Sequence, residues 1–450
     1  MIGFVRENLH RMRGSLRYQR FHELQAMQNL PPEELQKRQF AQISELLRYA
    51  YETVPYYRRS FGELGITPED VRSLEDFSRL PVLSRQSIQD NLADLVSSAC
   101  PEEKRSLNAS GGTTGKPVSV YQDSSMREEM EASFLFAFSF AGWQPSDMIV
   151  TIWGNPKDNA PASAGKKIKS WLGGVRRLNG YQYGKKEIQY WLEAIGSYHR
   201  VFIYGYVSVL SDVADYILNT NATVNNVHGI LTSAERLHPH QRELISKAFG
   251  CRVYDQYGCR EVPGISTECS EGNMHLLTYS AYTEFLPLKE NPGIPLEQFG
   301  EELPQRIVLT GFHNYAMPLI RYENGDMGRP KDGVCSCGRG FPLMQMDIGR
   351  VGSSLRLLDG KRLYSSVFVH QVSKTVGINA FQFRQTAADE VQLYIVRGTG
   401  FTDEGDKQLR DVVVRFPQSV CPGIRLNLHY VDDVPRTPAG KHRQVICEID

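Results

Sequence analysis

The stretch NASGGTTGKPVSV, from Asn108 to Val120, sets three glycines, two threonines and a lysine close together. Glycines let backbone N–H groups approach a phosphate because no Cβ stands in the way. Hydroxyl donors and the mobile ammonium group of Lys116 complete the composition of an anion-binding loop. The stretch therefore indicates a phosphate-binding loop, with a plain surface turn as the alternative.

The spacing of this loop differs from that of the P-loop, G-x-x-x-x-G-K-[ST]. With Gly115 and Lys116 as the G-K pair, Ser110 stands at the first glycine position and Pro117 at the hydroxyl position. Pro117 has no hydroxyl to offer to Mg²⁺, so the loop disfavours a P-loop NTPase, which would release ADP.

Composition limits the classes of function. The 450 residues predict two or three domains. Lys+Arg and Asp+Glu both number 51, so bulk electrostatic binding of nucleic acid is not expected. The longest apolar stretch, Phe134 to Trp143, is about half of the ~20 residues that a membrane span needs, and arginines replace the apolar core of a signal peptide. Eight scattered cysteines favour a reducing cytoplasm.

The middle of the chain alternates between two patterns. Short segments rich in β-branched and aromatic residues predict buried strands at 147–153, 200–206, 227–233, 251–258 and 305–312. Helical periodicity predicts helices between them, at 207–219 and 240–250. This alternation predicts a layered α/β fold.

The two ends of the chain differ from the middle. Residues 1–60 predict helices, and the basic N-terminus is either a solvated face of a docked helix or a weak peripheral membrane contact. The last hundred residues predict a small α+β domain. We place the boundary near Gly349, which gives an N-terminal domain at 1–349 and a C-terminal domain at 350–450.

Five stretches in chain order carry a resemblance to a known family. SGGTTGKP (Ser110–Pro117) resembles the phosphate loop of the adenylate-forming superfamily, [ST]-[ST]-G-[ST]-[ST]-G-x-P. LTSAERL (Leu231–Leu237) resembles its pocket-lining segment, and YDQYGCRE (Tyr254–Glu261) its Y-G-x-[ST]-E element, with Arg260 in place of the hydroxyl residue. RYENGDMG (Arg321–Gly328) and PRTPAGKHR (Pro435–Arg443) resemble its ribose-binding and catalytic-lysine elements.

Three further stretches narrow the branch. YAYETVPYYRRSF, LEDFSRLPVLSRQSIQDN and GYVSVL look like the phenylacetate–CoA ligase branch, which includes CapK-like proteins and coenzyme F390 synthetases. The resemblance covers nearly the whole chain. It implies a large α/β adenylation domain with a small mobile α+β lid domain, which rotates between a pose for adenylation and a pose for acyl transfer.

The resemblance implies a role for each matching residue. Catalytic roles fall to Lys441, Glu261 and Arg260, with Glu261 also the Mg²⁺ ligand. Contacts to ATP fall to Ser110, Gly111, Gly112, Thr113, Thr114, Gly115, Lys116, Ser233, Ala234, Glu235, Gln256, Tyr257, Gly258, Asp326 and Arg350. The acid pocket is expected to include Phe138, Tyr204, Gly205, Tyr206 and Ser208, although the phenylalanine-rich stretch around Phe138 also suits a buried helix face.

These roles suit the chemistry. Forming an acyl-adenylate brings a carboxylate and a triphosphate together, so the site must supply preorganised positive charge and hydrogen-bond donors. Mg²⁺ prefers carboxylate oxygen and keeps several waters. Lys441 would bridge the acid and the α-phosphate while pyrophosphate leaves.

Sulfur and imidazole groups form a second set. Cys335 and Cys337 lie in a C-x-C sequence, and Cys269 lies six residues before His275. Three thiols and one imidazole make a tetrahedral Zn²⁺ set with no open position, as in a structural site. Four unrelated buried residues are the alternative. Zinc sites of this kind occur in some members of the branch that the chain resembles.

The expected function is activation of a carboxylic acid by ATP to an acyl-adenylate, then acyl transfer to CoA or to an amine or hydroxyl in polysaccharide modification. A basic stretch, Gly165–Lys186, is a candidate CoA contact, with a solvated loop as the alternative. The alternative function is a silent nucleotide-binding scaffold. A homodimer is an assembly that the sequence leaves open.

Overall fold

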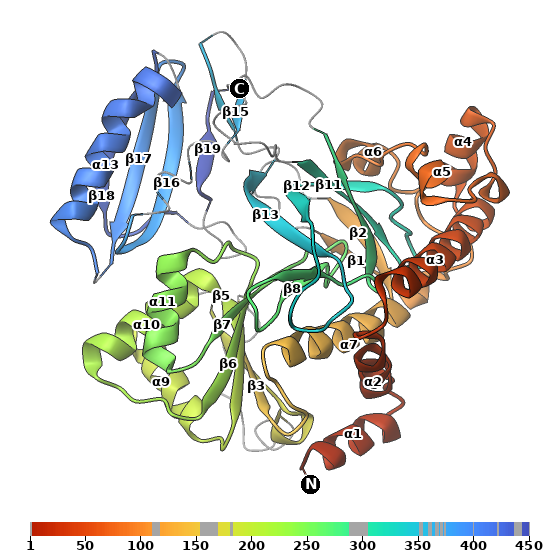
Figure 1. Ribbon diagram of the computed structural model, residues 1–450, viewed down its shortest axis with the longest axis horizontal. Helices are drawn as coiled ribbons and strands as arrows, with labels where there is room; N and C mark the ends of the chain where they lie inside the picture. The colour runs from red at the N-terminus through yellow and green to blue at the C-terminus, as the bar shows by residue number, and fades with distance from the viewer. Residues whose placement is uncertain are drawn as a thin grey trace.

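The structure is a computed structural model of the whole chain (Figure 1). It describes residues 2–109, 118–153, 170–180, 183–287, 305–350, 354–358, 362–364, 369, 372, 375–398, 400–420, 423–435 and 443–449. The statements below concern these residues.

The chain begins with helices, as predicted for residues 1–60. They are α1 (Ile2–Met12), α2 (Arg17–Met27), α3 (Pro32–Thr53), α4 (Pro55–Leu64), α5 (Leu74–Ser78) and α6 (Arg85–Asp90). α3 starts with proline at a position where its missing N–H costs nothing, and two glutamates follow in the first turn, near the positive end of the helix dipole. Pro55 then separates α3 from α4 because proline disfavours the helical conformation in the residue before it.

Eleven described strands form one large sheet. They are β3 (Met148–Trp153), β4 (Val175–Asn179), β5 (Val201–Tyr206), β6 (Val227–Ser233), β7 (Val253–Tyr257), β8 (Ser266–Glu268), β9 (Met274–Leu276), β10 (Ala281–Leu286), β11 (Gln305–Gly311), β12 (Tyr322–Lys331) and β13 (Leu343–Arg350). Their order is β10-β11-β12-β13-β9-β8-β7-β6-β5-β3-β4. The five predicted strands are therefore confirmed, each within two residues of its expected ends.

The sheet has a parallel half and an antiparallel half. The strands of the parallel half are, in order, β4, β3, β5, β6 and β7. From β7 the sheet continues through β8, β9, β13, β12, β11 and β10, and each neighbouring pair in this half is antiparallel. A separate hairpin of β1 (Arg105–Ala109) and β2 (Ser119–Asp123) carries the glycine-rich stretch between its strands. β7 lies where the parallel half meets the antiparallel half, and Glu261 follows its carboxyl end.

Helices cover both faces of the parallel half (Figure 1). α9 (Lys185–Gly196), α10 (Val207–Thr220) and α11 (Pro239–Phe249) lie on one face, over a core that includes Val150, Ile203 and Val253. α7 (Ser124–Phe140) lies on the other, over Phe202, Leu231 and Leu277. One face of β7 therefore packs toward α10 and α11, and the other packs toward α7.

The C-terminal part has its own core. Strands β18 (Arg425–Val431), β17 (Glu390–Arg397), β16 (Ile378–Ala387) and β19 (Val445–Cys447) form one sheet, packed with α13 (Asp403–Arg415) around Phe383 and Leu409. The chain also contains a short hairpin of β14 (Ser354–Arg356) and β15 (Arg362–Tyr364).

Hydrogen bonds join the C-terminal part to α10 and to His238, the residue before α11. Asn379 Nδ2 donates to Asp215 Oδ2 at 2.8 Å, and the Gln444 amide lies 3.1 Å from His238 Nε2. The predicted α/β fold with a smaller C-terminal domain is confirmed. The boundary near Gly349 stays a prediction. Among the described helices, none has the length and apolarity to cross a membrane.

Candidate active site and metal centre

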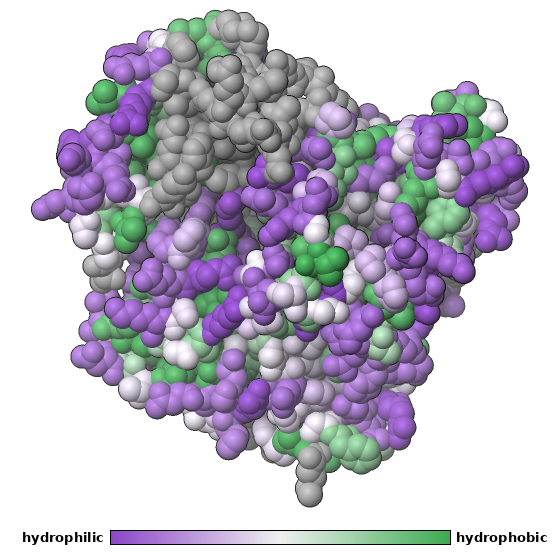
Figure 2. Space-filling view, in the orientation of Figure 1, coloured by the Kyte–Doolittle hydropathy of each residue, from purple (hydrophilic) through white to green (hydrophobic). Residues whose placement is uncertain are grey.

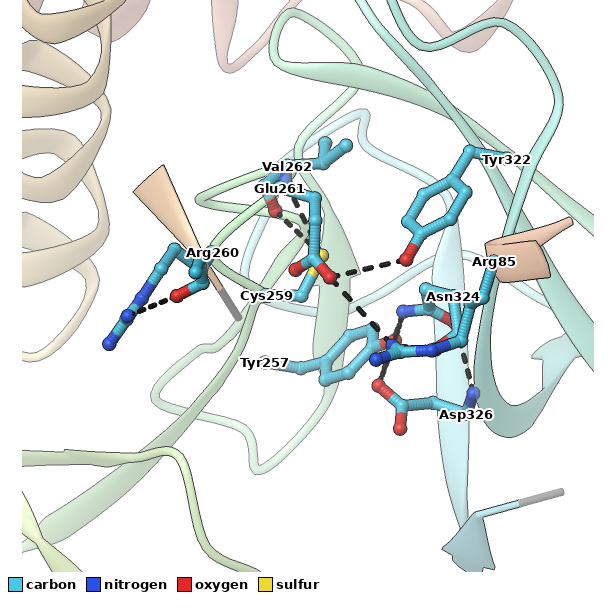
Figure 3. Close-up of polar contacts among 10 residues, drawn as sticks. Arg85, Tyr257, Cys259, Arg260, Glu261, Val262, Tyr322, Asn324 and Asp326 are labelled. Atoms are coloured by element: carbon cyan, nitrogen blue, oxygen red, sulfur yellow. Dashed lines mark hydrogen bonds and ion pairs between the residues drawn. The ribbon is translucent and has the colours of Figure 1, made fainter. Parts of the chain in front are cut away.

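Glu261 and Asp326, the two carboxylates predicted for the site, lie in one polar network (Figure 3). Glu261 follows the end of β7 and is 4% exposed, and Asp326 lies within β12 and is 7% exposed. Tyr257, Tyr322 and Asn324 contribute the neutral donors that contact these carboxylates. Burial of two carboxylates is tolerated because each accepts hydrogen bonds.

Glu261 is held from the β12 side and from helix α6. Tyr322 Oη donates to Glu261 Oε1 at 3.1 Å, and Arg85 Nη1 lies 3.8 Å from the same oxygen (Figure 3). Burial first, and the Glu261 carboxylate second, raise the pKa of Tyr322 far above its usual value. Tyr322 therefore keeps its proton and remains a donor to Glu261.

Asp326 belongs to a compact triad with Tyr257 and Asn324. Tyr257 Oη donates to Asp326 Oδ2 at 3.0 Å, and Asn324 Nδ2 reaches the Tyr257 oxygen at 2.6 Å and Asp326 Oδ2 at 3.1 Å. Burial first, then Asp326, raise the pKa of Tyr257 well above its usual value. Two of the predicted ATP contacts, Tyr257 and Asp326, are thus brought into direct contact.

The turn after β7 also needs the glycine predicted at position 258. A Cβ there would lie 3.1 Å from the backbone nitrogen of Gly264, closer than side chains are usually found. This close approach folds the turn so that Glu261 points back toward β12.

Arg260 reaches the base of the phosphate-loop hairpin. Its guanidinium donates to the carbonyl of Ala109, the last residue of β1, and Gln122 Nε2 on β2 donates to the Arg260 carbonyl at 2.9 Å. Ser110 to Lys116 lie outside the described residues. The described contacts therefore place a positive charge next to the point where the glycine-rich stretch begins.

The end of β6 and the two residues after it, Ser233 to Glu235, include a strained residue. Ala234 has φ of 72°, in the left-handed region that a Cβ disfavours. The Glu235 carboxylate accepts from the Ser208 N–H at 2.8 Å and from its hydroxyl at 3.1 Å. Two predicted site residues, Ser208 and Glu235, therefore bond to each other at the start of α10.

Aromatic rings line the face of the sheet beneath α7. Phe138 and Phe134 lie 5.1 and 5.8 Å from the ring of Tyr204, measured between ring centroids. Trp153 stacks on Tyr204 at 5.1 Å and on Tyr206 at 4.1 Å. The predicted pocket residues on β5 and α7 are thus neighbours. Gly205 faces α10 instead, where a Cβ would lie 3.0 Å from the Ile152 carbonyl oxygen and 3.4 Å from Leu210.

Other predicted site residues cannot be placed. Lys441 and the loop around it lie outside the described residues, as do Lys166, Lys167 and Lys169 of the basic stretch. Arg350 is the last residue of β13, and its Cα lies opposite that of Asp326. The structure describes the backbone of Arg350 but not its side chain. The backbone register alone therefore places position 350 beside the predicted ribose contact.

Cys269, His275, Cys335 and Cys337 converge, as their residue types predicted. Their ligand atoms all lie within 4.8 Å of one another. Cys269 Sγ lies 3.6 Å from Cys335 Sγ, and Cys337 Sγ lies 3.3 Å from His275 Nε2. The other ring nitrogen, His275 Nδ1, lies 3.2 Å from the Phe341 carbonyl, which fixes the ring as outer-shell partners do in zinc sites. Three thiols and one imidazole at this spacing fit a tetrahedral Zn²⁺ ion.

Three residues of the carboxylate network were not predicted as site residues. Tyr322 and Asn324 precede the predicted Asp326 in RYENGDMG, and Arg85 lies in PVLSRQSIQDN, so all three lie within stretches that carried the resemblance. Alternation along β12 was the available signal, because residues 322, 324 and 326 share one face of a strand. Arg85 had no such signal, since α6 meets β12 only in the tertiary fold.

Comparisons with known protein sequences agree with the motifs. The CapK C-terminal domain family matches residues 358–448. A phenylacetate–coenzyme A ligase from Thermus thermophilus is 26% identical over 93% of this chain and 98% of its own length. Protein CapK from Staphylococcus aureus is 22% identical over 92% of this chain and 89% of its own.

Solved structures agree with the fold. 2-Hydroxyisobutyryl-CoA ligase in the postadenylation state, in complex with R3-HIB-AMP, is 18% identical and superposes with a TM-score of 0.71 over 94% of this chain and 91% of that one. The same ligase in the thioesterification state gives 0.60. The sequence comparisons confirm the resemblance to the adenylate-forming superfamily, in its phenylacetate–CoA ligase and CapK branch, and the solved structures confirm the fold.

Proposed function

We propose that this relative of the phenylacetate–CoA ligases is an ATP-dependent, AMP-forming ligase that activates a carboxylic acid and passes the acyl group to an acceptor. The observation that best supports this activity is the buried network of Glu261 and Asp326 beside the hairpin that bears the glycine-rich stretch. Separate neutral donors hold the two carboxylates, Tyr322 for Glu261 and Tyr257 for Asp326. Such a site can bind a metal–nucleotide complex through one acid and a ribose through the other.

The chain's own residues divide the work. Glu261 is the Mg²⁺ ligand, and the metal, when bound, neutralises charge on the transferring phosphate. Asp326 accepts hydrogen bonds from the ribose hydroxyls, with Arg350 nearby on β13. Ser110 to Lys116 hold the phosphates that leave as pyrophosphate, and Arg260 adds positive charge at the base of that loop. Lys441 bridges the acid and the α-phosphate as charge moves between them.

CoA is the acceptor that the comparisons favour. The similar proteins include ligases whose names specify coenzyme A, and the similarity to Protein CapK keeps an amine or hydroxyl of a polysaccharide precursor as the second choice. In this reading the C-terminal domain rotates between adenylation and acyl transfer. The TM-score is higher against the postadenylation structure than against the thioesterification structure. This difference supports a C-terminal domain in the adenylation pose.

An exchange assay tests the activity. The enzyme, ATP, Mg²⁺ and labelled pyrophosphate are incubated with a panel of acids, and label entering ATP is measured. We expect exchange with at least one acid, and AMP release when CoA or an amine is added. Absence of exchange with every acid, together with retained nucleotide binding, would favour the silent scaffold instead.

Cys269, His275, Cys335 and Cys337 hold a structural Zn²⁺ ion in this proposal. The donor set is complete without a substrate position, and Asn273 Nδ2 donates to Cys335 Sγ at 3.2 Å as a second support. The cluster ties the β8–β9 hairpin to the segment that precedes β13. Elemental analysis of the purified protein should find about one zinc per chain.

Exposed apolar side chains on α1 support a further proposal, that this helix makes a weak peripheral contact with membranes. Phe4 is 73% exposed and Met12 81% exposed, next to exposed Arg11 and Arg13, and apolar side chains gather near the N-terminus in Figure 2. Phe4→Ser should reduce co-sedimentation with phosphatidylserine vesicles, whereas Leu64→Ser on α4 should not. Equal binding by both variants would reject it. Cytoplasmic location and a homodimer stay predictions.

A further inference from the structure

Gln256 on β7 has a buried side chain amide without a partner. The residue is 4% exposed, and among the residues that the structure describes neither Nε2 nor Oε1 has a hydrogen-bond partner. Leaving such a group unpaired inside a protein is costly, because the amide gives up water and gains nothing in exchange. A glutamine kept there is therefore expected to bind something that the chain itself does not supply.

Alternation along β7 shows which face this amide occupies. Val253 packs in the core under α10 and α11, whereas Tyr254 packs against the core under α7. Asp255 returns to the first face, where its Oδ1 accepts from the Thr232 hydroxyl at 3.2 Å. Gln256 therefore lies on the α7 face, together with the aromatic rings of Phe134, Phe138 and Tyr204.

Polar residues flank Gln256 on both neighbouring strands. Its Cα is opposite that of Ser233 on β6 and that of Thr267 on β8, and residues in register share a face. Thr267 is fully buried, and its hydroxyl also has no partner within the described part of the chain. Ser233, Gln256 and Thr267 thus form a short polar row, buried within a face that is otherwise aromatic and apolar.

The polar row lies close to the carboxyl ends of the parallel strands. Tyr206, Ser233 and Gln256 stand at or next to the carboxyl ends of β5, β6 and β7, where parallel strands of such sheets meet their ligands. Glu261, the proposed metal ligand, follows only five positions after Gln256. A few fixed polar groups within an apolar pocket are the usual way that a binding site selects its ligand.

We propose that Gln256 is a specificity-determining residue whose amide hydrogen-bonds to a polar group on the acyl part of the acid, so that the substrate class is acids with a hydroxyl, amide or carbonyl substituent. This inference rests on the proposed ligase function and names the substrate of the same site. It assigns Gln256 to the acid, whereas the sequence placed it among the ATP contacts. An unpartnered amide discriminates strongly, since an acid without the polar group would leave it unpaired in the closed site.

Matched acids test the assignment. Pyrophosphate exchange is measured for the wild-type protein and for Gln256→Met with three pairs of acids, each an apolar acid and a polar counterpart. Phenylacetate is paired with 4-hydroxyphenylacetate and with 4-acetamidophenylacetate, and butyrate is paired with 3-hydroxybutyrate. We expect the wild type to prefer the polar member of at least one pair by about 10-fold or more in kcat/KM. Gln256→Met should bring that ratio close to one, mainly by losing activity on the polar member, with the KM for ATP unchanged.

A stability measurement supplies a readout that does not depend on the choice of acid. Without ligand, Gln256→Met should leave the thermal unfolding midpoint unchanged or raise it, because the substitution removes an unpaired amide. Ser266→Ala is the matched control, since it deletes another unpartnered buried hydroxyl on the opposite face of β8. It should share the effect on stability and leave acid preference unaltered.

Each outcome decides a different claim. Exchange by the wild type with no polar preference, a ratio unmoved by Gln256→Met, a raised KM for ATP or a lowered midpoint would each overturn the role of Gln256. Absence of exchange with every acid would instead contradict the proposed ligase function, and the unfolding midpoint would still report whether the amide is paired within the protein.

Discussion

The antiparallel half of the large sheet carries two clusters of Lewis bases that are built in opposite ways. In the Cys/His cluster, four ligand atoms lie within 4.8 Å of one another and face inward. In the carboxylate network, Glu261 and Asp326 accept hydrogen bonds from two different tyrosine hydroxyls, those of Tyr322 and Tyr257. One arrangement is closed around a centre, whereas in the other Glu261 lines a pocket.

The two arrangements distinguish a structural centre from a reactive one before any ligand is bound. Ligand atoms that converge on one point satisfy a metal fully and leave no position for a substrate. Carboxylates supported by neutral donors on one side can still bind a metal and a sugar on the other. Substitutions in the first cluster should therefore act mainly on stability, and substitutions in the second mainly on rate.

The largest effect is expected from removing the metal. Stripping zinc with a chelator should lower the thermal unfolding midpoint by about 10 °C or more, because structural zinc contributes several kcal/mol to folding. Cys335→Ser should do the same, with Cys100→Ser, outside the cluster, as the control. Differential scanning calorimetry with parallel metal analysis measures this. A metal-free protein with an unaltered midpoint would contradict the structural role.

Lys441→Ala should affect chemistry alone. We expect adenylation to fall by about 10³-fold, the upper range for a single preorganised donor in a transition state. Thioester formation from a supplied acyl-adenylate should persist, and the unfolding midpoint should stay within a degree or two. Rapid-quench assays of the two half-reactions make the comparison. Equal loss in both halves would show that Lys441 serves another role.

The extent of sequence-based prediction follows the same division. Contiguous motifs carried most of the site: Tyr257 and Glu261 come from one stretch and Asp326 from another, and strand alternation within β12 could have added Asn324. The Cys/His set was predictable because thiols and imidazole have a restricted chemistry. Arg85 was not predictable, because its position beside Glu261 depends on how α6 packs against β12. The role of Gln256 could be inferred only once the two faces of β7 were known.

A smaller effect is expected from Glu261→Gln. The change keeps the size of the side chain and its contact with Tyr322 but removes the charge that Mg²⁺ requires. Adenylation should fall by about 10²-fold and demand a higher Mg²⁺ concentration, with little loss of stability, since a buried charge is removed along with its cost. Titrating Mg²⁺ in the exchange assay tests this against Glu63→Gln, an exposed acid on α4. A normal Mg²⁺ dependence would move the metal site elsewhere.

Asp326→Asn should have the smallest effect. The amide oxygen can still accept one hydrogen bond, so the KM for ATP should rise by about 10-fold, the cost of replacing a charged acceptor with a neutral one, while kcat changes less. Replacing ATP with 2′-deoxy-ATP or 3′-deoxy-ATP sharpens the test. If Asp326 binds the ribose, the wild type should lose affinity for a deoxynucleotide and Asp326→Asn should lose less, because the same hydrogen bond cannot be lost twice. Additive losses for both nucleotides would separate Asp326 from the ribose and leave it a support for Tyr257, which would make this acid as structural as the Cys/His cluster.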